Sequence, residues 1–400
     1  DAMKAIADQI HARGLKAGLW MGVFNDEDNP DWRPYCWGHQ FPQFDPDFRG
    51  DIRCPGNTGG NLNYHLNLDI FKTWLANLMR RVTSVGGNNW GFDYLKMDFL
   101  DQGHGTDLEY REACRILKDN MRPGTQVLHS NSKQMNVIGI VTAMRAGDDV
   151  SPRWSDGSAG IDPTLRGVSY QWYAHNNFWI TDPDTVHIRV QQDGWGVTYA
   201  EAQSWATIAA LSGGIIKMGD RFWDPSQVPA DRLHFYKRIA PPYGVAAIPI
   251  DMFEHNSRNR DYPNFFVLPV KKPWGNYWVI GVFNWAGSAA TKTVDFVKCF
   301  EVGAQEVFHI FDYWSDRYLG THSGSLNVTL DSHACKLYAV VPRDVTRPQI
   351  VSTDRHISQG GVDLAAVNWD AGNKILTGTS TRLVTGVPYT MVLSIPAGFT

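Results

Sequence analysis

The sequence predicts an α/β protein built on a parallel sheet and followed by an antiparallel β-domain. Over about the first 245 residues, short apolar runs alternate with amphipathic helical patterns, which is typical of a parallel sheet covered by helices. After about Ile250 the helical patterns stop, and short alternating strands separated by Gly-, Ser- and Asn-containing turns indicate an antiparallel β-sandwich. A chain of 400 residues is long enough for two or three such domains.

The apolar runs of the first region are its predicted strands, and each run tends to end at a polar residue that opens a loop. They are Leu15–Val23, Phe92–Phe99, Gln126–His129, Ile138–Arg145, Asn177–Thr181 and Gly214–Met218. Helical patterns cover Met3 to Ile10, Ile70 to Met79, Ala200 to Leu211 and Pro229 to Ile239. A (β/α)8 TIM barrel needs eight strands, so we expect an N-terminally truncated barrel that lacks its first two. A complete six-stranded open sheet is the alternative.

The second region contains six predicted strands. They are Asn264–Val270, Tyr277–Asn284, Thr291–Phe296, Ala304–Asp312, Ser325–Leu330 and Cys335–Pro342. We therefore divide the chain into a catalytic (β/α) barrel at 1–247, an antiparallel β-sandwich at 248–343 and the start of an additional β module at 344–400.

Composition excludes several classes of protein. No apolar run approaches the roughly 18 residues of a membrane span, and a net charge of -4 without a basic block argues against a nucleic-acid partner. No dinucleotide or Walker motif follows a strand, and His129 and His175 are isolated, so we expect no cofactor and no metal. Of the five cysteines, Cys36 and Cys54 share one loop, where a disulfide and two free thiols remain open alternatives.

Aromatic residues are abundant, with 16 Trp, 15 Tyr and 19 Phe. They fit either a large packed core or flat walls for the C–H faces of sugars.

Catalytic groups of a TIM barrel lie at the carboxyl ends of its strands, which draws attention to Tyr94-Leu-Lys-Met-Asp98. Strand alternation places Lys96 and Asp98 on one face, and the lysine favours an ionised carboxylate. Such a carboxylate in a cleft can attack an anomeric carbon. A structural Lys–Asp pair is the alternative.

A second pair of acids, Asp148 and Asp149, follows the strand that ends at Arg145. One of them could cap the following helix, and the other could act as a general acid. With two strands missing, Asp98 ends strand 4 and Asp149 ends strand 6, and alternate strands aim at a common layer of the barrel.

Further polar and aromatic groups lie near other predicted strand ends. Asp182 and Asp184 flank Pro183 at such an end and fit either sugar hydroxyls or a helix cap. Trp20 ends the first predicted strand and fits a sugar-stacking wall or a core position. Asn131 lies where a loop would meet a substituent of the substrate.

These residues resemble the α-galactosidase clan, which comprises glycoside hydrolase families 27 and 36 and their melibiase-like relatives. The shared elements run in the clan's order and cover about residues 1–342. They are His11-Ala-Arg-Gly-Leu-Lys-Ala-Gly-Leu-Trp20, Tyr94-Leu-Lys-Met-Asp98, Arg145-x-x-x-Asp149-Val, Asp182-Pro-Asp184, Leu211-Ser-Gly-Gly214, Pro241-Pro-Tyr-Gly244, Ile248-Pro-Ile-Asp251 and Phe311-Asp-Tyr-Trp314 to Gly320.

The resemblance implies a retaining exo-α-glycosidase, an α-galactosidase first of all, that needs no cofactor. It implies Asp98 as nucleophile and Asp149 as acid/base in a double displacement. It also implies substrate contacts by the group Lys96, Arg145, Trp20, Asn131, Asp182 and Asp184.

Several alternatives stay open. Within the clan they are α-N-acetylgalactosaminidase, β-L-arabinopyranosidase, α-glucan hydrolase and transglycosylase, and outside it a non-catalytic carbohydrate-binding protein. The expected partner is an oligosaccharide or polysaccharide, and the appended β-modules favour a secreted or periplasmic protein.

Overall fold

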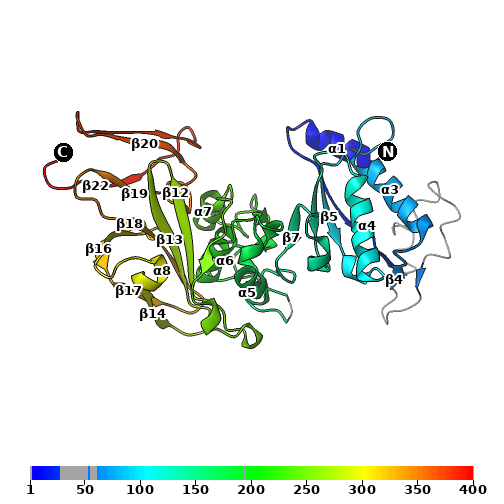
Figure 1. Cartoon of the computed structure of the whole chain (residues 1–400), viewed down its shortest axis with the longest axis horizontal. Coiled ribbons are helices and arrows are strands. Elements are labelled where there is room, and N and C mark those ends of the chain that lie inside the picture. The colour runs from blue at the N-terminus through cyan, green and yellow to red at the C-terminus, as the bar shows by residue number, and fades with distance from the viewer. Residues whose placement is uncertain (1, 28–52, 55–60, 158, 193, 400) are drawn as a thin grey trace. The chain divides into compact units, whose positions relative to one another are not determined.

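The computed structural model describes residues 2–27, 53–54, 61–157, 159–192 and 194–399 (Figure 1). It divides into two compact units. The first unit comprises Asp1–Arg145 and Phe178–Ile180, and the second comprises Ala146–Asn177 and Thr181–Thr400. The predicted Cys36–Cys54 pair falls on Cys36, which lies outside the described residues.

The first unit is a parallel sheet with helices. Strands β1 (Gly18–Gly22), β5 (Tyr94–Asp98), β6 (Gln126–His129) and β7 (Ala143–Arg145) lie in this order and run parallel. The helices are α1 (Ala2–His11), α3 (Asp69–Thr83) and α4 (Asp107–Asp119). A small antiparallel sheet joins β2 (Asn25–Glu27), β3 (Arg53–Cys54) and β4 (Asn61–Tyr64), which the sequence patterns do not predict.

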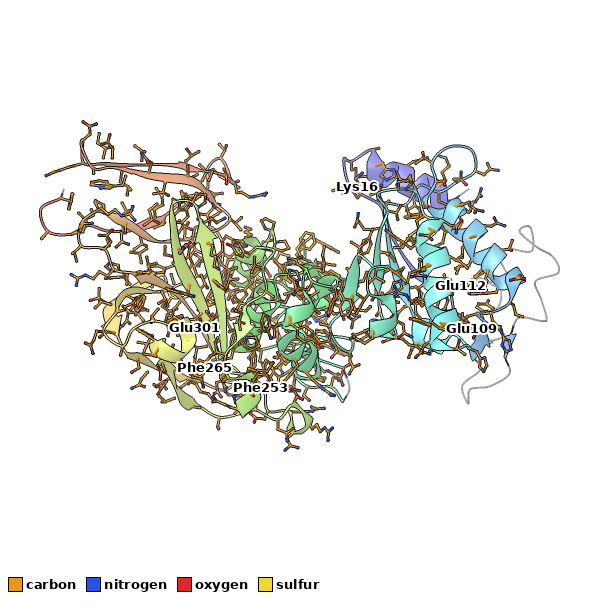
Figure 2. All side chains as sticks on the ribbon, in the orientation of Figure 1. Lys16, Glu109, Glu112, Phe253, Phe265 and Glu301 are labelled. Carbon is orange, nitrogen blue, oxygen red and sulfur yellow. The ribbon has the colours of Figure 1, made fainter. Side chains whose placement is uncertain are left out.

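The helices of this unit begin and pack where side-chain chemistry favours them. Thr106 and Glu109 form a capping box at the start of α4, and α4 lies beside α3 (Figures 1 and 2). Phe24, which follows β1, contacts Phe71 of α3 and Tyr110 of α4 edge-to-face, at centroid distances of 6.0 and 5.7 Å. These aromatic contacts fix both helices against the end of β1.

Asp93, just before β5, anchors three segments of the first unit. Its carboxylate accepts hydrogen bonds from His11 Nε2 at 2.7 Å, the Ala17 N–H at 2.9 Å and the Arg122 guanidinium at 2.8 Å. Burial alone would raise the pKa of Asp93, but these hydrogen bonds outweigh it and lower the pKa well below its ordinary value.

We expect Asp93→Asn to lower the free energy of unfolding by about 2 kcal/mol at neutral pH, because it takes the charged acceptor away from three part-buried donors. Because the folded-state pKa is depressed, this stabilisation is present above the unfolded-state pKa of about 4 and is lost as the pH falls towards the folded-state value. Urea denaturation checks both points. Asp8→Asn, at an exposed ion pair with Lys4, is the control and should cost under about 0.5 kcal/mol.

The second unit begins with helices and two short parallel strands. Helices α5 (Ile161–Tyr170), α6 (Tyr199–Leu211) and α7 (Ala230–Ile239) accompany β9 (Thr185–Val186) and β10 (Lys217–Met218). Strand β8 (Ile180–Asp182) straddles the boundary between the units. Helix α6 starts with a capping box of Thr198 and Glu201, and it is buried along most of its length.

The β-sandwich follows as a six-stranded antiparallel sheet. Its strand order is β11 (Ile248–Pro249), β12 (Phe265–Lys272), β13 (Gly275–Phe283), β18 (Cys335–Pro342), β15 (Val307–Asp312) and β16 (Arg317–Ser323). A second layer pairs β14 (Ala290–Asp295) with β17 (Ser325–Leu330), next to the short helix α8 (Phe296–Phe300).

Both faces of the large sheet are buried, which explains the continuous apolar run of β13. Val279 and Phe283 belong to the core that contains α6, whereas Ile280 and Val282 belong to the core of the second β-layer. Between them, a Cβ at Gly281 would lie only 2.7 Å from Leu211 Cδ1 of α6. The absence of a side chain at Gly281 leaves room for Leu211 in this close approach of helix and sheet.

The last strands form two antiparallel pairs. They are β19 (Gln349–Thr353) with β22 (Met391–Ser394), and β20 (Leu364–Asp370) with β21 (Ile375–Ser380). The Tyr277 hydroxyl of β13 donates to the Ser358 carbonyl at 2.7 Å, which ties the segment between β19 and β20 to the sandwich.

The prediction of a parallel α/β region followed by an antiparallel β-sandwich is confirmed. Three predicted strands are wrong in part. The prediction Asn177–Thr181 overlaps the observed strand Ile180–Asp182 only at its end, because residues 177 and 178 are turn. The first half of 138–145 is turn, with Gly139 at φ 79°, and the strand covers only Ala143–Arg145. Similarly, 214–218 is strand only at Lys217–Met218, because the backbone at Gly214 approaches the Thr181 carbonyl so closely that a Cβ would clash with it.

Candidate active site

The Asp98 carboxylate lies at the carboxyl end of β5 and is held by three hydrogen bonds. Oδ2 accepts one from Trp20 Nε1 at 2.9 Å, and Oδ1 accepts two, from the Phe99 N–H at 2.9 Å and Asn131 Nδ2 at 3.2 Å. Lys96 Nζ lies 4.0 Å from Oδ2. Asp98 is only 7% exposed, so these partners, rather than bulk water, compensate its charge.

The register of the parallel strands brings these groups together. Trp20 is the Cα partner of Lys96, and it lies in the middle of β1, so the prediction that Trp20 ends its strand is wrong. The strand continues through Gly22, which pairs with Asp98. The Trp20 indole contacts Phe99 edge-to-face at 6.1 Å and is 50% exposed, which leaves it accessible to a ligand.

Two residues beside the carboxylate have left-handed backbone conformations. Phe99 has φ 53° and Asn131 has φ 46°, which is uncommon for residues other than glycine. Both donate to Asp98 Oδ1, one through its backbone and one through its side chain. Strained backbone of this kind persists where the surrounding structure enforces it and is concentrated at functional sites.

Arg145, at the end of β7, is buried in the same unit at 3% exposure. Its guanidinium donates to Ser130 Oγ at 3.4 Å, and its carbonyl accepts from Gln134 Nε2 at 3.2 Å. Arg145 is thus placed beside the segment that carries Asn131, and its predicted role as a substrate contact stays a prediction.

His129, the last residue of β6, is fully buried, and burial lowers its pKa to about 3. We expect the free energy of unfolding to fall by about 2 kcal/mol between pH 7 and pH 5, because only the unfolded chain takes up this proton there. Urea denaturation at both pH values measures this loss. The pH dependence should shrink in His129→Gln but persist in the control His104→Gln, at an exposed histidine of the same unit. An unchanged pH dependence in His129→Gln would contradict the assignment.

Asp149 lies in the second unit, in an exposed position in the loop that leads to α5. Its carbonyl accepts from the Gly160 N–H at 3.1 Å, and the next N–H, that of Val150, donates to Asp184 Oδ2 at 2.9 Å. The N-cap of α5 is Gly160. The interpretation of Asp148 or Asp149 as the cap of that helix is therefore wrong.

Asp182 and Asp184 form one cluster with Lys217. Lys217 Nζ lies 2.7 Å from Asp182 Oδ2 and 3.0 Å from Asp184 Oδ1. Asp184 adopts φ 69°. Its Oδ2 accepts a hydrogen bond from the Val150 N–H, which orders the loop that carries Asp149. Helix α6 is capped by Thr198, so neither aspartate caps it.

The structure thus groups Trp20, Lys96, Asp98, Asn131 and Arg145 in the first unit, and the remaining predicted residues in the second. Sequence reasoning missed Lys217, although its place at the end of an apolar run before Gly219-Asp220 is a usable signal. It also missed a pocket of about 450 Å³ that follows β9 and β10. Its lining residues are Arg189, Val190, Gln192, Trp195 and Gln227.

Within residues 2–27, 53–54, 61–157, 159–192 and 194–399, no cluster of three or more His, Cys, Asp or Glu side chains has the arrangement of a metal site. Over the same residues, no helix combines the length and apolarity that a membrane crossing requires.

Known proteins resemble both the parallel α/β region and the β-sandwich of this chain. Residues 270–340, inside the β-sandwich, match the family described as "Alpha galactosidase C-terminal beta sandwich domain". Over 350 residues the chain is 23% identical to an α-galactosidase of Cyamopsis tetragonoloba, and this match covers 85% of the chain and 70% of that protein. The chain resembles the α-galactosidase clan.

Solved structures of other proteins share the fold of this chain. A β-L-arabinopyranosidase of Geobacillus stearothermophilus matches with a TM-score of 0.56 and 16% identity, over 85% of this chain and 77% of its own. An isomalto-dextranase of Arthrobacter globiformis complexed with panose matches with a TM-score of 0.60 and 16% identity, over 87% of this chain and 62% of its own. At 16% identity these two structures show that the fold is shared.

Proposed function

We propose that the protein is a retaining exo-α-glycosidase that removes terminal α-linked galactose from an oligosaccharide or polysaccharide. The observation that supports it most is the environment of Asp98. A carboxylate at a strand end, held by three donors beside a lysine and an accessible indole, is suited to attack an anomeric carbon. The 23% identity with an α-galactosidase favours galactose as the sugar.

In the proposed reaction, the Asp98 carboxylate displaces the aglycone and forms a glycosyl ester with the anomeric carbon. Asp149 donates a proton to the departing oxygen, and then removes a proton from the water that hydrolyses the ester. The Trp20 indole, half exposed beside the nucleophile, packs against the apolar face of the sugar. Lys96, Arg145, Asn131, Asp182 and Asp184 hold its hydroxyl groups.

A second candidate is the same chemistry on another sugar. The solved relatives include a β-L-arabinopyranosidase and an isomalto-dextranase, and their folds match this chain at TM-scores of 0.56 and 0.60. The choice of sugar depends on few polar contacts, because a site built to bind a hydroxyl rejects analogues that lack it.

The proposal is tested by measuring turnover of several glycosides, with proton NMR to identify the sugar anomer that is released first. We expect activity on nitrophenyl α-galactoside and raffinose, with α-galactose as the first anomer released, because two displacements restore the configuration. Activity confined to nitrophenyl β-L-arabinopyranoside or panose would select the second candidate. Release of the β-anomer of galactose would contradict the retaining mechanism.

A further inference from the structure

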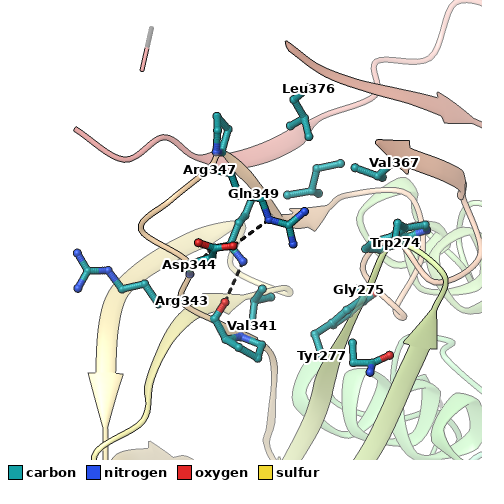
Figure 3. A pocket seen from close by; sticks show the side chains of 14 residues that line it. Trp274, Gly275, Tyr277, Val341, Arg343, Asp344, Arg347, Gln349, Val367 and Leu376 are labelled. Atoms are coloured by element: carbon teal, nitrogen blue, oxygen red, sulfur yellow. Dashed lines mark hydrogen bonds and ion pairs between the residues drawn. The ribbon is translucent and has the colours of Figure 1, made fainter. Parts of the chain in front are cut away.

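A second pocket lies in the second unit, between the β-sandwich and the last strand pairs, and none of the proposed catalytic or sugar-binding residues lines it (Figure 3). Its volume is about 230 Å³. Three segments contribute to it: the turn and start of β13 around Trp274, the end of β18 with the loop up to Ile350, and the β20–β21 pair through Val367 and Leu376.

Trp274 forms a flat wall whose position is fixed from behind. Its ring stacks on Tyr277 with a centroid distance of 5.9 Å and an interplanar angle of 25°. Tyr277 is itself buried, and its hydroxyl donates to the carbonyls of Ser358 and Gln359 at 2.7 and 3.1 Å. The Trp274 Nε1 atom is buried and has no hydrogen-bond partner among the described residues, so the indole contributes its ring, rather than this N–H, to the pocket.

The opposite wall is a loop that is closed by its own hydrogen bonds. Gln349 accepts from the Asp344 N–H at 2.6 Å and donates to the Pro342 carbonyl at 2.9 Å. Asp344 accepts from Arg347 Nε at 2.9 Å, which orients the guanidinium while its two terminal nitrogens form no hydrogen bond to any described residue. Hydrogen bonds from the Thr346 side chain and N–H also lower the pKa of Asp344, so its carboxylate stays ionised beside Arg347.

We propose that this pocket binds one neutral sugar unit of an oligosaccharide, at a site separate from the proposed catalytic groups. A sugar ring has an apolar C–H face, which matches the Trp274 ring, and hydroxyl oxygens around its edge, which match the terminal nitrogens of Arg347. Both walls are held in place before binding, so binding costs little conformational entropy of the protein.

Size and charge restrict the ligand further. The volume is below the roughly 300–1,000 Å³ of sites for drug-sized ligands, which favours a single unit over a longer segment. Arg347 is balanced by Asp344, and the Arg343 side chain points away from Trp274 and Tyr277 (Figure 3). The charges within the pocket therefore cancel, which favours a neutral sugar over an acidic one.

The test follows the indole N–H signal of Trp274 by ¹⁵N NMR in the full chain carrying Asp98→Asn, which prevents turnover of the probe. Trp274→Phe assigns the signal by its disappearance. We expect raffinose or panose to shift the Trp274 signal saturably, with little shift for Trp223, an exposed tryptophan outside the pocket. Arg347→Met should weaken the binding about tenfold or more, because it removes a charged donor.

Absence of a saturable Trp274 shift with both sugars would overturn the proposal, as would binding that Arg347→Met leaves unchanged. A shift with galacturonate alone would overturn the neutral-sugar assignment. The proposed glycosidase function is measured separately, as turnover by the chain without Asp98→Asn. Turnover without a Trp274 response refutes only the second site, and a Trp274 response without turnover refutes only the glycosidase.

Discussion

We expect Asp98→Asn to lower kcat on nitrophenyl α-galactoside by at least about 10³-fold, with KM changed far less. The substitution keeps the shape of the side chain but replaces the anionic carboxylate by a neutral amide, whose oxygen is a far weaker nucleophile. Steady-state kinetics measure the loss, and circular dichroism verifies the fold. Asp107→Asn is the matched control, since Asp107 is a 74% exposed acid of the same unit and should retain the full kcat.

A small external nucleophile sharpens this test. In Asp98→Ala, azide can occupy the space of the missing carboxylate and attack the anomeric carbon, while the aryl group leaves. Recovery of turnover with β-galactosyl azide as the product assigns the nucleophile directly, because a single displacement inverts the configuration. If Asp98→Asn retains more than about a tenth of kcat, Asp98 is not the nucleophile.

Asp149→Asn gives the second large effect, and its size depends on the leaving group. We expect kcat/KM on raffinose to fall about 10²- to 10⁴-fold, because the departing sugar oxygen needs a proton. A dinitrophenyl leaving group needs none, so kcat/KM on that substrate should fall much less. The neighbouring Asp148→Asn is the control, because Asp148 is exposed in the same loop and has no proposed role. Equal losses on both substrates would exclude Asp149 as the acid/base.

Periodicity predicts the regular parts of this fold well. The strands Gln126–His129 and Cys335–Pro342 were predicted with the bounds that the structure shows, because their apolar runs are bounded by turns. The apolar run 138–145 was misleading, since its first half packs as turns. Buried turns are apolar as well, so hydrophobicity alone does not distinguish a buried strand from a buried turn.

The Asp98 environment was predictable in residue type but not in geometry. Strand alternation places Lys96 and Asp98 on one face, and the motif order adds Trp20 and Asn131. The indole-to-carboxylate hydrogen bond depends on the register of β1 against β5, which no local pattern encodes. The ion pairs of Lys217 could not be predicted locally, because its partners Asp182 and Asp184 lie over thirty residues earlier in the chain.

The three donors around Asp98 also bear on the lifetime of the proposed glycosyl ester. Hydrogen bonds to a carboxylate are strongest when it carries its full charge, which disfavours its attack on the sugar and favours its departure. Three donors, from Trp20, Phe99 and Asn131, stabilise the free carboxylate. They lose this charged acceptor when the ester forms and regain it when water releases the sugar. The site is therefore biased towards fast breakdown of its own covalent intermediate, so the first displacement, rather than the second, should limit turnover on unactivated substrates.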